Sequence, residues 1–372
     1  MGELIIAVIS FIGGWLAGRV LDYSLDKAVD TIALHKRRKK IKDVKDHANT
    51  DIQVLCSGVP CFTPENIYAE VDQATGLFLA FPEELAAQLP KSVGTFKTKD
   101  ELFAPLTLPG CDEETVHTAV EEARYKIARM FIERQDGLFF NGKKYGIVYA
   151  DGFSRTTDNT ENPILTLKLF NTDHYTHRVL SEVIDNLQID KTLLNQKMLN
   201  TRLNWLRTSF GISAIVVLRS TDQIIMTRRS PNAAYTEGKI WTYVSVTETF
   251  TETDYDQYSH CADLALCMKR GIQEELGITP GMYHESTIKF YDTFYETHFF
   301  QDGIVGSVEL KEGILFEDVK NLLAKDKQLE VESLFVIDNN KKAIAKFIAE
   351  NKDQMRSQTI FALNSYAARL RQ

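Results

Sequence analysis

An arginine and two glutamates near residue 274 are the side chains of this sequence with the clearest capacity for chemistry. In "KRGIQEELGI", residues 269 to 278, Arg270 precedes Glu274 by four positions and Glu275 follows directly. If this stretch is helical, the guanidinium and both carboxylates can converge near the helix end. One interpretation is a solvated helix face with an i,i+4 ion pair, which contributes little to stability. The other is an acidic cluster that resembles a metal-binding helix.

The segments before this cluster predict the elements that position it. "GISAIVVL" (211–218) and "QIIMTRRS" (223–230) flank a short turn and predict a β-hairpin. "WTYVSVTE" (241–248) predicts a third strand. A helix is expected from Tyr258 to Leu276, because a glycine and then a proline follow it.

The middle of the chain carries weaker signals. Helices are predicted at 82–89 and 112–135, and strands at 145–150 and 164–170. His174 and His177 are three residues apart without a third ligand in register, so we interpret them as polar or capping residues, or as part of a ligand pocket, rather than as a metal site. No chemical motif is found in residues 51–110.

Composition excludes some classes of function. The net charge is −8, with 51 acidic and 43 basic residues among 372, and this balance argues against a protein that binds DNA or RNA polymers. The five cysteines form no even framework and are expected to be reduced.

The N-terminal residues predict a membrane anchor. Residues 4–18 carry no charge, and a helix over residues 1–21 would be about 31 Å long, which just spans a hydrocarbon core of roughly 30 Å. The only charge ahead of this run is Glu3, which is not typical of a secretory signal. The basic run at 35–42 places the following body on the cytoplasmic side, which predicts a single-pass protein.

Small residues recur along this N-terminal segment. Ser10, Gly14 and Gly18 are spaced by four and would lie on one helix stripe, where a second helix can approach closely. The stripe therefore suggests self-association in the bilayer, whereas glycines that only add flexibility are the alternative.

The order of strands, loop and helix resembles the Nudix superfamily, whose box reads G(x5)E(x7)REUxEExGU. "RGIQEELGI" matches the second half of this box. Gly271 stands where the family has the first glutamate of that half, and the front half is lost or re-spaced. Glu248, in "VSVTE", is expected near the place of the missing part. The matching positions are Arg270, Ile272, Glu274, Glu275, Gly277 and Ile278.

More closely, the sequence resembles the membrane-tethered effectors of bacterial CBASS antiphage systems, which carry a SMODS-associated Nudix domain. The resemblance covers roughly residues 139–335 and is carried by "LTLKLFNTDHY", "SFGISAIVVL", "QIIMTRRS", "KIWTYVSVTE" and "RGIQEELGI". It implies a protein of the bacterial inner membrane that is activated by a cyclic oligonucleotide, made by a partner CD-NTase upon infection. It also implies that the activated protein oligomerises and disrupts the membrane, in an abortive infection.

The resemblance leaves two activities open. In the family, glutamates of the box hold Mg²⁺ against a pyrophosphate. Here Glu248, Glu274 and Glu275 are the candidate metal ligands, and Mg²⁺ is an optional cofactor. Gly271 offers no oxygen and loosens the helix by about 1 kcal/mol, which favours binding without turnover. The alternative is an active, membrane-tethered hydrolase of nucleoside-diphosphate-linked substrates, in which Arg270, Glu274 and Glu275 act in catalysis.

A bound nucleotide needs cations for phosphate and an aromatic face for a base. Arg155, Arg228 and Arg229 are candidates for the first role, and Trp241 and Tyr243 for the second. A core position is the alternative for Trp241. Because side chains alternate along a strand, only one of Arg228 and Arg229 can enter the same pocket.

These signals predict an α+β or α/β protein with a Nudix-like mixed sheet flanked by helices. The expected parts are a membrane helix (1–21), a helical stalk with a basic juxtamembrane segment (22–49), an N-terminal α+β extension (50–137) and a SMODS-associated Nudix-like domain with C-terminal helices (138–372).

Overall fold

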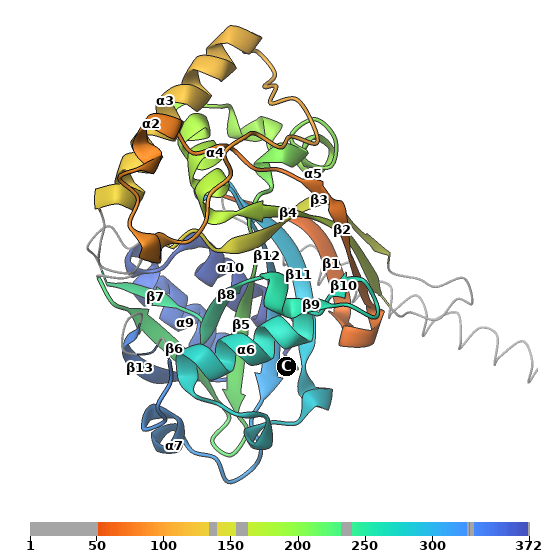
Figure 1. Ribbon diagram of the computed structural model, residues 1–372. Coiled ribbons are helices and arrows are strands. Elements are labelled where there is room, and N and C mark those ends of the chain that lie inside the picture. The colour runs from red at the N-terminus through yellow and green to blue at the C-terminus, as the bar shows by residue number, and fades with distance from the viewer. Residues whose placement is uncertain are drawn as a thin grey trace, which may run out of the picture.

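The chain forms an α+β structure of two mixed sheets flanked by helices (Figure 1). A computed structural model describes residues 51–133, 140–153, 163–231, 240–325, 327 and 331–370. Within these ranges, no helix combines the length and apolar character needed to cross a membrane. The expected membrane helix with Ser10, Gly14 and Gly18, the expected stalk, and Arg155 lie outside the described residues. The predicted mixed sheet flanked by helices is therefore confirmed, and the membrane helix stays a prediction.

The larger sheet has eight strands, of which six run in the order β1-β11-β12-β5-β6-β13. Strand β7 pairs with β6, and β8 pairs with β5. Only β5 and β12 pair in parallel, so the sheet is mixed. The strands are β1 (Ile52–Phe62), β5 (Phe210–Leu218), β6 (Gln223–Arg229), β7 (Trp241–Tyr243), β8 (Val246–Thr249), β11 (Lys289–Glu296), β12 (Gln301–Glu309) and β13 (Val331–Asp338).

Strands β5 and β6 separate a short distance beyond their turn, and Ser245 lies between them where they part. The two strands pair only next to their turn, where Val217 lies opposite Ile224. Beyond that point the Ser245 hydroxyl accepts from Val216 N at 2.7 Å and donates to Ile225 O at 2.5 Å. The strand expected over 241–248 is therefore two strands, because its two halves pair with different partners.

The smaller sheet has five strands in the order β3-β4-β2-β10-β9, with β2 and β4 parallel. Helices α3 (Glu113–Glu133) and α4 (His174–Leu187) pack on each other beside it (Figure 1). The predicted helix at 112–135 and the strands at 145–150 and 164–170 are confirmed. The strands are β2 (Ile67–Gly76), β3 (Lys143–Phe153), β4 (Ile164–Asp173), β9 (Tyr255–Asp256) and β10 (Cys261–Ala262), and two short helices are α2 (Glu83–Ala86) and α5 (Gln196–Leu199).

The two sheets are interleaved along the chain. Strand β1 pairs with β11 in the larger sheet, and β2 pairs with β4 in the smaller one. Each sheet therefore contains strands from both sides of the expected boundary between residues 137 and 138.

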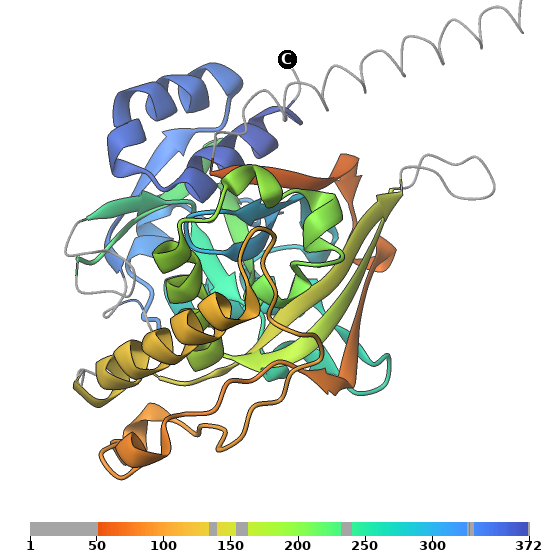
Figure 2. The same cartoon turned by 90° about the horizontal axis from the view of Figure 1, so that it is seen from above.

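Helices cover both faces of the larger sheet. Along β5, Ala214 and Val216 face the core under α6 (Leu264–Leu276), whereas Ile215 and Val217 face α9 (Lys341–Asn351) and α10 (Ser357–Ala367). Figures 1 and 2 show α6 on one side of this sheet and α9 with α10 on the other. A further short helix is α7 (Phe316–Lys320).

Helix α6 begins later than the sequence suggests. It starts at Leu264, not Tyr258, because Asp263 caps it by accepting from Ala265 N at 2.8 Å and Leu266 N at 3.0 Å. The residues just before the cap pair as β9 and β10. The predicted end is confirmed, since Gly277 takes the left-handed conformation with φ 77°.

Candidate functional site

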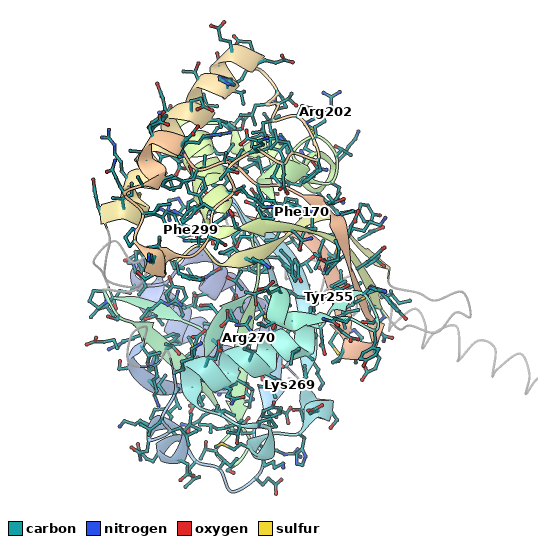
Figure 3. All side chains as sticks on the ribbon, in the orientation of Figure 1. Phe170, Arg202, Tyr255, Lys269, Arg270 and Phe299 are labelled. Atoms are coloured by element: carbon teal, nitrogen blue, oxygen red, sulfur yellow. The ribbon has the colours of Figure 1, made fainter. Side chains whose placement is uncertain are left out.

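Arg270 is the centre of a network of three carboxylates. Its Nε and Nη2 donate to Asp254 Oδ1 and Oδ2 at 3.0 and 2.8 Å, and Asp254 is fully buried. Its Nη1 lies 3.2 Å from Glu248 Oε1 and 3.3 Å from Glu274 Oε2. Burial alone would lower the pKa of Arg270, but the carboxylates of Asp254 and Glu248 raise it. The guanidinium is therefore a permanent cation that ties the strand, the loop and the helix together. Figure 3 labels it on α6.

Gly271 lets α6 lie directly on β8. A Cβ at this position would meet Glu248 Cβ at 2.8 Å and Val246 Cγ1 at 2.9 Å. Real Cβ atoms do not approach other carbons this closely, so the packing requires glycine. A glutamate at position 271 would need β8 to move, because the space it would enter is taken by the side chain of Glu248.

A pocket of about 210 Å³ lies beside this contact, where β5, β8 and β12 meet. It combines charges of both signs with aromatic rings. Its polar and aromatic walls are Lys144, His177, Ser213, Arg229, Tyr243, Thr247, Glu248, Thr249, Glu275, Phe294, Phe299, Gln301, Asp302 and Gln358.

Lys144 and His177 form one wall of this pocket. Burial lowers the pKa of Lys144 to about 8, although the Glu248 carboxylate acts to raise it. Lys144 Nζ lies 3.3 Å from Ser209 Oγ. Burial also lowers the pKa of His177 well below its ordinary value, and its Nδ1 lies 3.1 Å from Thr208 Oγ1. At neutral pH this wall presents one titratable cation and one neutral imidazole.

The two histidines of α4 lie close together but differ in their surroundings. The rings of His174 and His177 are 6.5 Å apart between centroids, and burial lowers both pKa values well below 6.5. Of the two, only His177 lines the pocket, so it corresponds to the pocket interpretation of the sequence.

The three candidate metal ligands line two different pockets, although Glu248 and Glu274 both contact Arg270. Glu248 and Glu275 line the pocket, where Glu248 Oε1 accepts from Thr249 N at 2.8 Å and Glu275 Oε1 from Thr247 N at 3.3 Å. Burial raises the pKa of Glu248, whereas Arg270 acts to lower it. Adjacent helix residues diverge by about 100°.

Glu274 consequently lies on a separate, open groove, where its Oε1 is 3.4 Å from Lys325 Nζ. Among the residues that the structure describes, no three His, Cys, Asp or Glu side chains form a metal-binding group. A metal held by Glu248, Glu274 and Glu275 therefore stays a prediction.

The candidate ligand-binding residues divide between the pocket and the surface. Arg229 and Tyr243 line the pocket, and the guanidinium carbon of Arg229 is 5.2 Å from the Tyr243 ring centroid. Arg228 points the other way along β6 and covers the Phe335 ring at 5.2 Å. Trp241 does not line the pocket, and its ring lies 4.1 Å from the guanidinium carbon of Arg356.

Three other pocket residues were not predicted from the sequence. Lys144 on β3, Phe299 before β12 and Gln358 on α10 come from segments far apart in the chain, and only the fold brings them together. Phe299 is the one with a local clue, because it belongs to the aromatic turn "HFFQ" between two strands.

Comparisons with known proteins add no assignment, since neither a protein-family model nor a curated protein matches this sequence. A function for the site must therefore be inferred from its own charges, rings and distances.

Proposed function

We propose that this protein is a membrane-anchored effector that senses a cyclic oligonucleotide through the pocket beside α6. The proposal joins three parts: a ligand site with cations and rings, an acidic helix that binds without hydrolysis, and an N-terminal membrane segment that carries the output. The antiphage context of CBASS comes from the sequence resemblance alone.

The charges of the pocket suit a phosphate next to a base. Lys144 and Arg229 supply two cations, and a guanidinium can hold phosphate oxygens in a bidentate fashion. Tyr243 and Phe299 supply rings on which a base can stack. The volume of about 210 Å³ is below the roughly 300–1,000 Å³ usual for ligand pockets, so it suits one nucleotide unit of a larger ring.

The contact of Gly271 with β8 is the observation that carries the sensing proposal. Hydrolysis of a pyrophosphate by a Nudix helix needs fixed metal geometry. Here the position of one acidic ligand is a glycine that packs on Glu248, and Glu274 lines the separate groove and not the pocket. Two carboxylates remain, and both already accept hydrogen bonds from backbone amides. This arrangement supports retention of a ligand without turnover.

In this proposal the ligand acts by shifting the equilibrium between a resting form and an assembled form of the protein. A ligand drives an assembly only as far as it binds that assembly better than the resting form. In this proposal the bound form associates through residues 1–21, in which Ser10, Gly14 and Gly18 form the stripe for helix contact, and the assembled helices breach the bilayer.

Binding can be tested with the full-length protein in detergent and a panel of cyclic di- and trinucleotides of adenosine and guanosine. We expect at least one member to raise the melting temperature in the absence of Mg²⁺, because the pocket itself supplies the cations. No thermal shift with any member would contradict the sensing proposal.

Two further measurements separate the alternative. If the protein with Mg²⁺ hydrolyses linear dinucleotides, and Glu274→Gln with Glu275→Gln abolishes this activity, the protein is a tethered hydrolase instead. If deletion of residues 1–21 leaves cellular toxicity unchanged, the membrane output is wrong.

A further inference from the structure

Asp51, the first residue that the structure describes, is held by two different segments. Its carbonyl oxygen accepts from Thr297 N at 2.8 Å, and its Oδ2 accepts from Ser357 Oγ at 3.3 Å. Thr297 belongs to the turn between β11 and β12, and Ser357 is the first residue of α10. We call these three residues the Asp51 clasp. In sequence, the clasp is the point at which the chain leaves the expected membrane segment and stalk and enters β1.

The same two segments form one wall of the pocket. Phe299 follows Thr297 by two residues, and Gln358 directly follows Ser357; both side chains line the 210 Å³ pocket. Each half of the clasp is therefore joined through one or two peptide units to a side chain that a ligand would touch. Figure 3 labels Phe299, which lies between the α3–α4 layer and the part of the molecule that carries α6.

Arg356 connects the two segments to each other. The residue is 6 % exposed, and its guanidinium carbon lies 4.6 Å from the Phe299 ring centroid and 4.1 Å from the Trp241 ring centroid. Cation–π contacts of this kind are strongest when they are desolvated, as here. A β-bridge between Thr242 and Met355 fixes the same region to β7. Phe299 cannot change its position in the pocket without disturbing Arg356, which is next to Ser357.

We propose that this connected set is a relay: a ligand that packs on Phe299 and Gln358 stiffens the Asp51 clasp, and thereby fixes the point where the N-terminal segment joins the body. This proposal depends on the proposed function, because it states how a ligand in the same pocket would affect the start of β1. It gives Trp241 a role as a positioning residue, which acts through Arg356 and not by stacking a base.

Spatial connection alone does not establish energetic coupling, so the test measures coupling directly. Full-length protein in lipid nanodiscs is analysed by amide hydrogen exchange with and without the panel of cyclic di- and trinucleotides. We expect a bound member to slow exchange at Thr297 and at residues 52–54 by about fivefold or more, the lower end of typical couplings between sites. This protection must extend beyond the pocket wall itself.

Two variants and a matched control isolate the relay. Ser357→Ala removes the bond to the Asp51 carboxylate, and Trp241→Leu removes the ring that braces Arg356; neither side chain lines the pocket. Both are expected to retain binding while losing most of the protection at residues 52–54. Ser220→Ala is the control, because its hydroxyl accepts from Gly313 N at 2.7 Å on a remote surface. It should behave as the parent protein does.

Each outcome is decisive. Protection that is lost in Ser357→Ala and Trp241→Leu, but kept in Ser220→Ala, supports the relay. If a nucleotide binds and slows exchange only at the pocket wall, or if both variants keep the protection, the relay is wrong and the sensing function stands. If no member of the panel binds, the sensing function fails and the relay fails with it.

Discussion

Replacing Gly271 by alanine separates the packing explanation of this residue from a simple loss of a catalytic acid. A glycine in the interior of an exposed helix costs about 1 kcal/mol relative to alanine, so helix propensity alone predicts that Gly271→Ala stabilises the protein by that amount. The contact between α6 and β8 predicts the opposite sign, because the new Cβ would lie 2.8 Å from Glu248 Cβ and 2.9 Å from Val246 Cγ1.

The expected size follows from these two effects. Both neighbouring atoms belong to residues of β8 in the larger sheet, so neither can move as freely as the end of a long, flexible side chain. Overpacking of this kind costs typically 1–3 kcal/mol. Subtracting the gain in propensity from the middle of this range leaves a net destabilisation of about 1 kcal/mol for alanine. Glutamate at the same position adds a larger side chain and a second acid beside Glu248, and it should cost more and should not restore hydrolysis.

Urea unfolding of the full-length protein in detergent measures this difference. The control is Gly281→Ala, because a Cβ at Gly281 meets nothing within 4 Å and this substitution should leave the midpoint close to that of the parent. If Gly271→Ala unfolds at the same urea concentration as the parent or at a higher one, the close approach of α6 to β8 is wrong. In that case the absent glutamate would need another explanation.

Three further predictions concern the charges of the site. Arg229→Ala should weaken binding of an anionic nucleotide by about tenfold or more, as measured by calorimetry. Arg228→Ala should change the Kd less than twofold, because this side chain lies on the Phe335 side of β6. Equal losses of affinity would contradict the placement of the two arginines on opposite faces of the strand. Burial lowers the pKa of Lys144 to about 8 from its ordinary 10.5, so its charge and the affinity for an anion are nearly full at pH 7 or below and decline as the pH rises through 8. Lys144→Arg should remove this decline between pH 7 and 9, and a flat profile in the parent would refute it. Arg270→Ala leaves the carboxylate of Asp254 buried without its partner and should cost about 3–5 kcal/mol by urea unfolding, so a cost below about 1 kcal/mol would show that the network is solvated.

Local patterns predicted the elements whose signals are local. The β-branched runs of β5 and β6 around their turn, the amphipathic α3 and the glycine end of α6 were all readable from neighbouring residues. The start of α6 was not, because residues 258–262 have a plausible helical composition, and only the pairing of β9 with β10 and the cap at Asp263 exclude them. Cross-strand pairing is invisible in a single stretch of sequence.

The site itself was predictable only where one element carries it. The ion pair of Arg270 with Glu274 follows from helical spacing, and the opposite directions of Arg228 and Arg229 follow from strand alternation. Lys144, Phe299 and Gln358 reach the same pocket from three separate segments, which no spacing rule relates. For Trp241 the sequence left open a core position or a stack with a base, and it could not indicate the partner Arg356, which lies more than 100 residues away in the chain.

The pairing of β1 with β11 sets an order of events during synthesis. Cys56 N donates to Thr293 Oγ1, a contact across 237 positions of sequence. At about 5–20 residues per second, a ribosome needs on the order of 12–50 s to supply that partner. If the first residues enter the bilayer as soon as they emerge, the nascent chain is tethered long before the larger sheet can close around its first strand. The body would then mature on a tethered chain, in which β1 stays without its partner strand until residue 293 has been made.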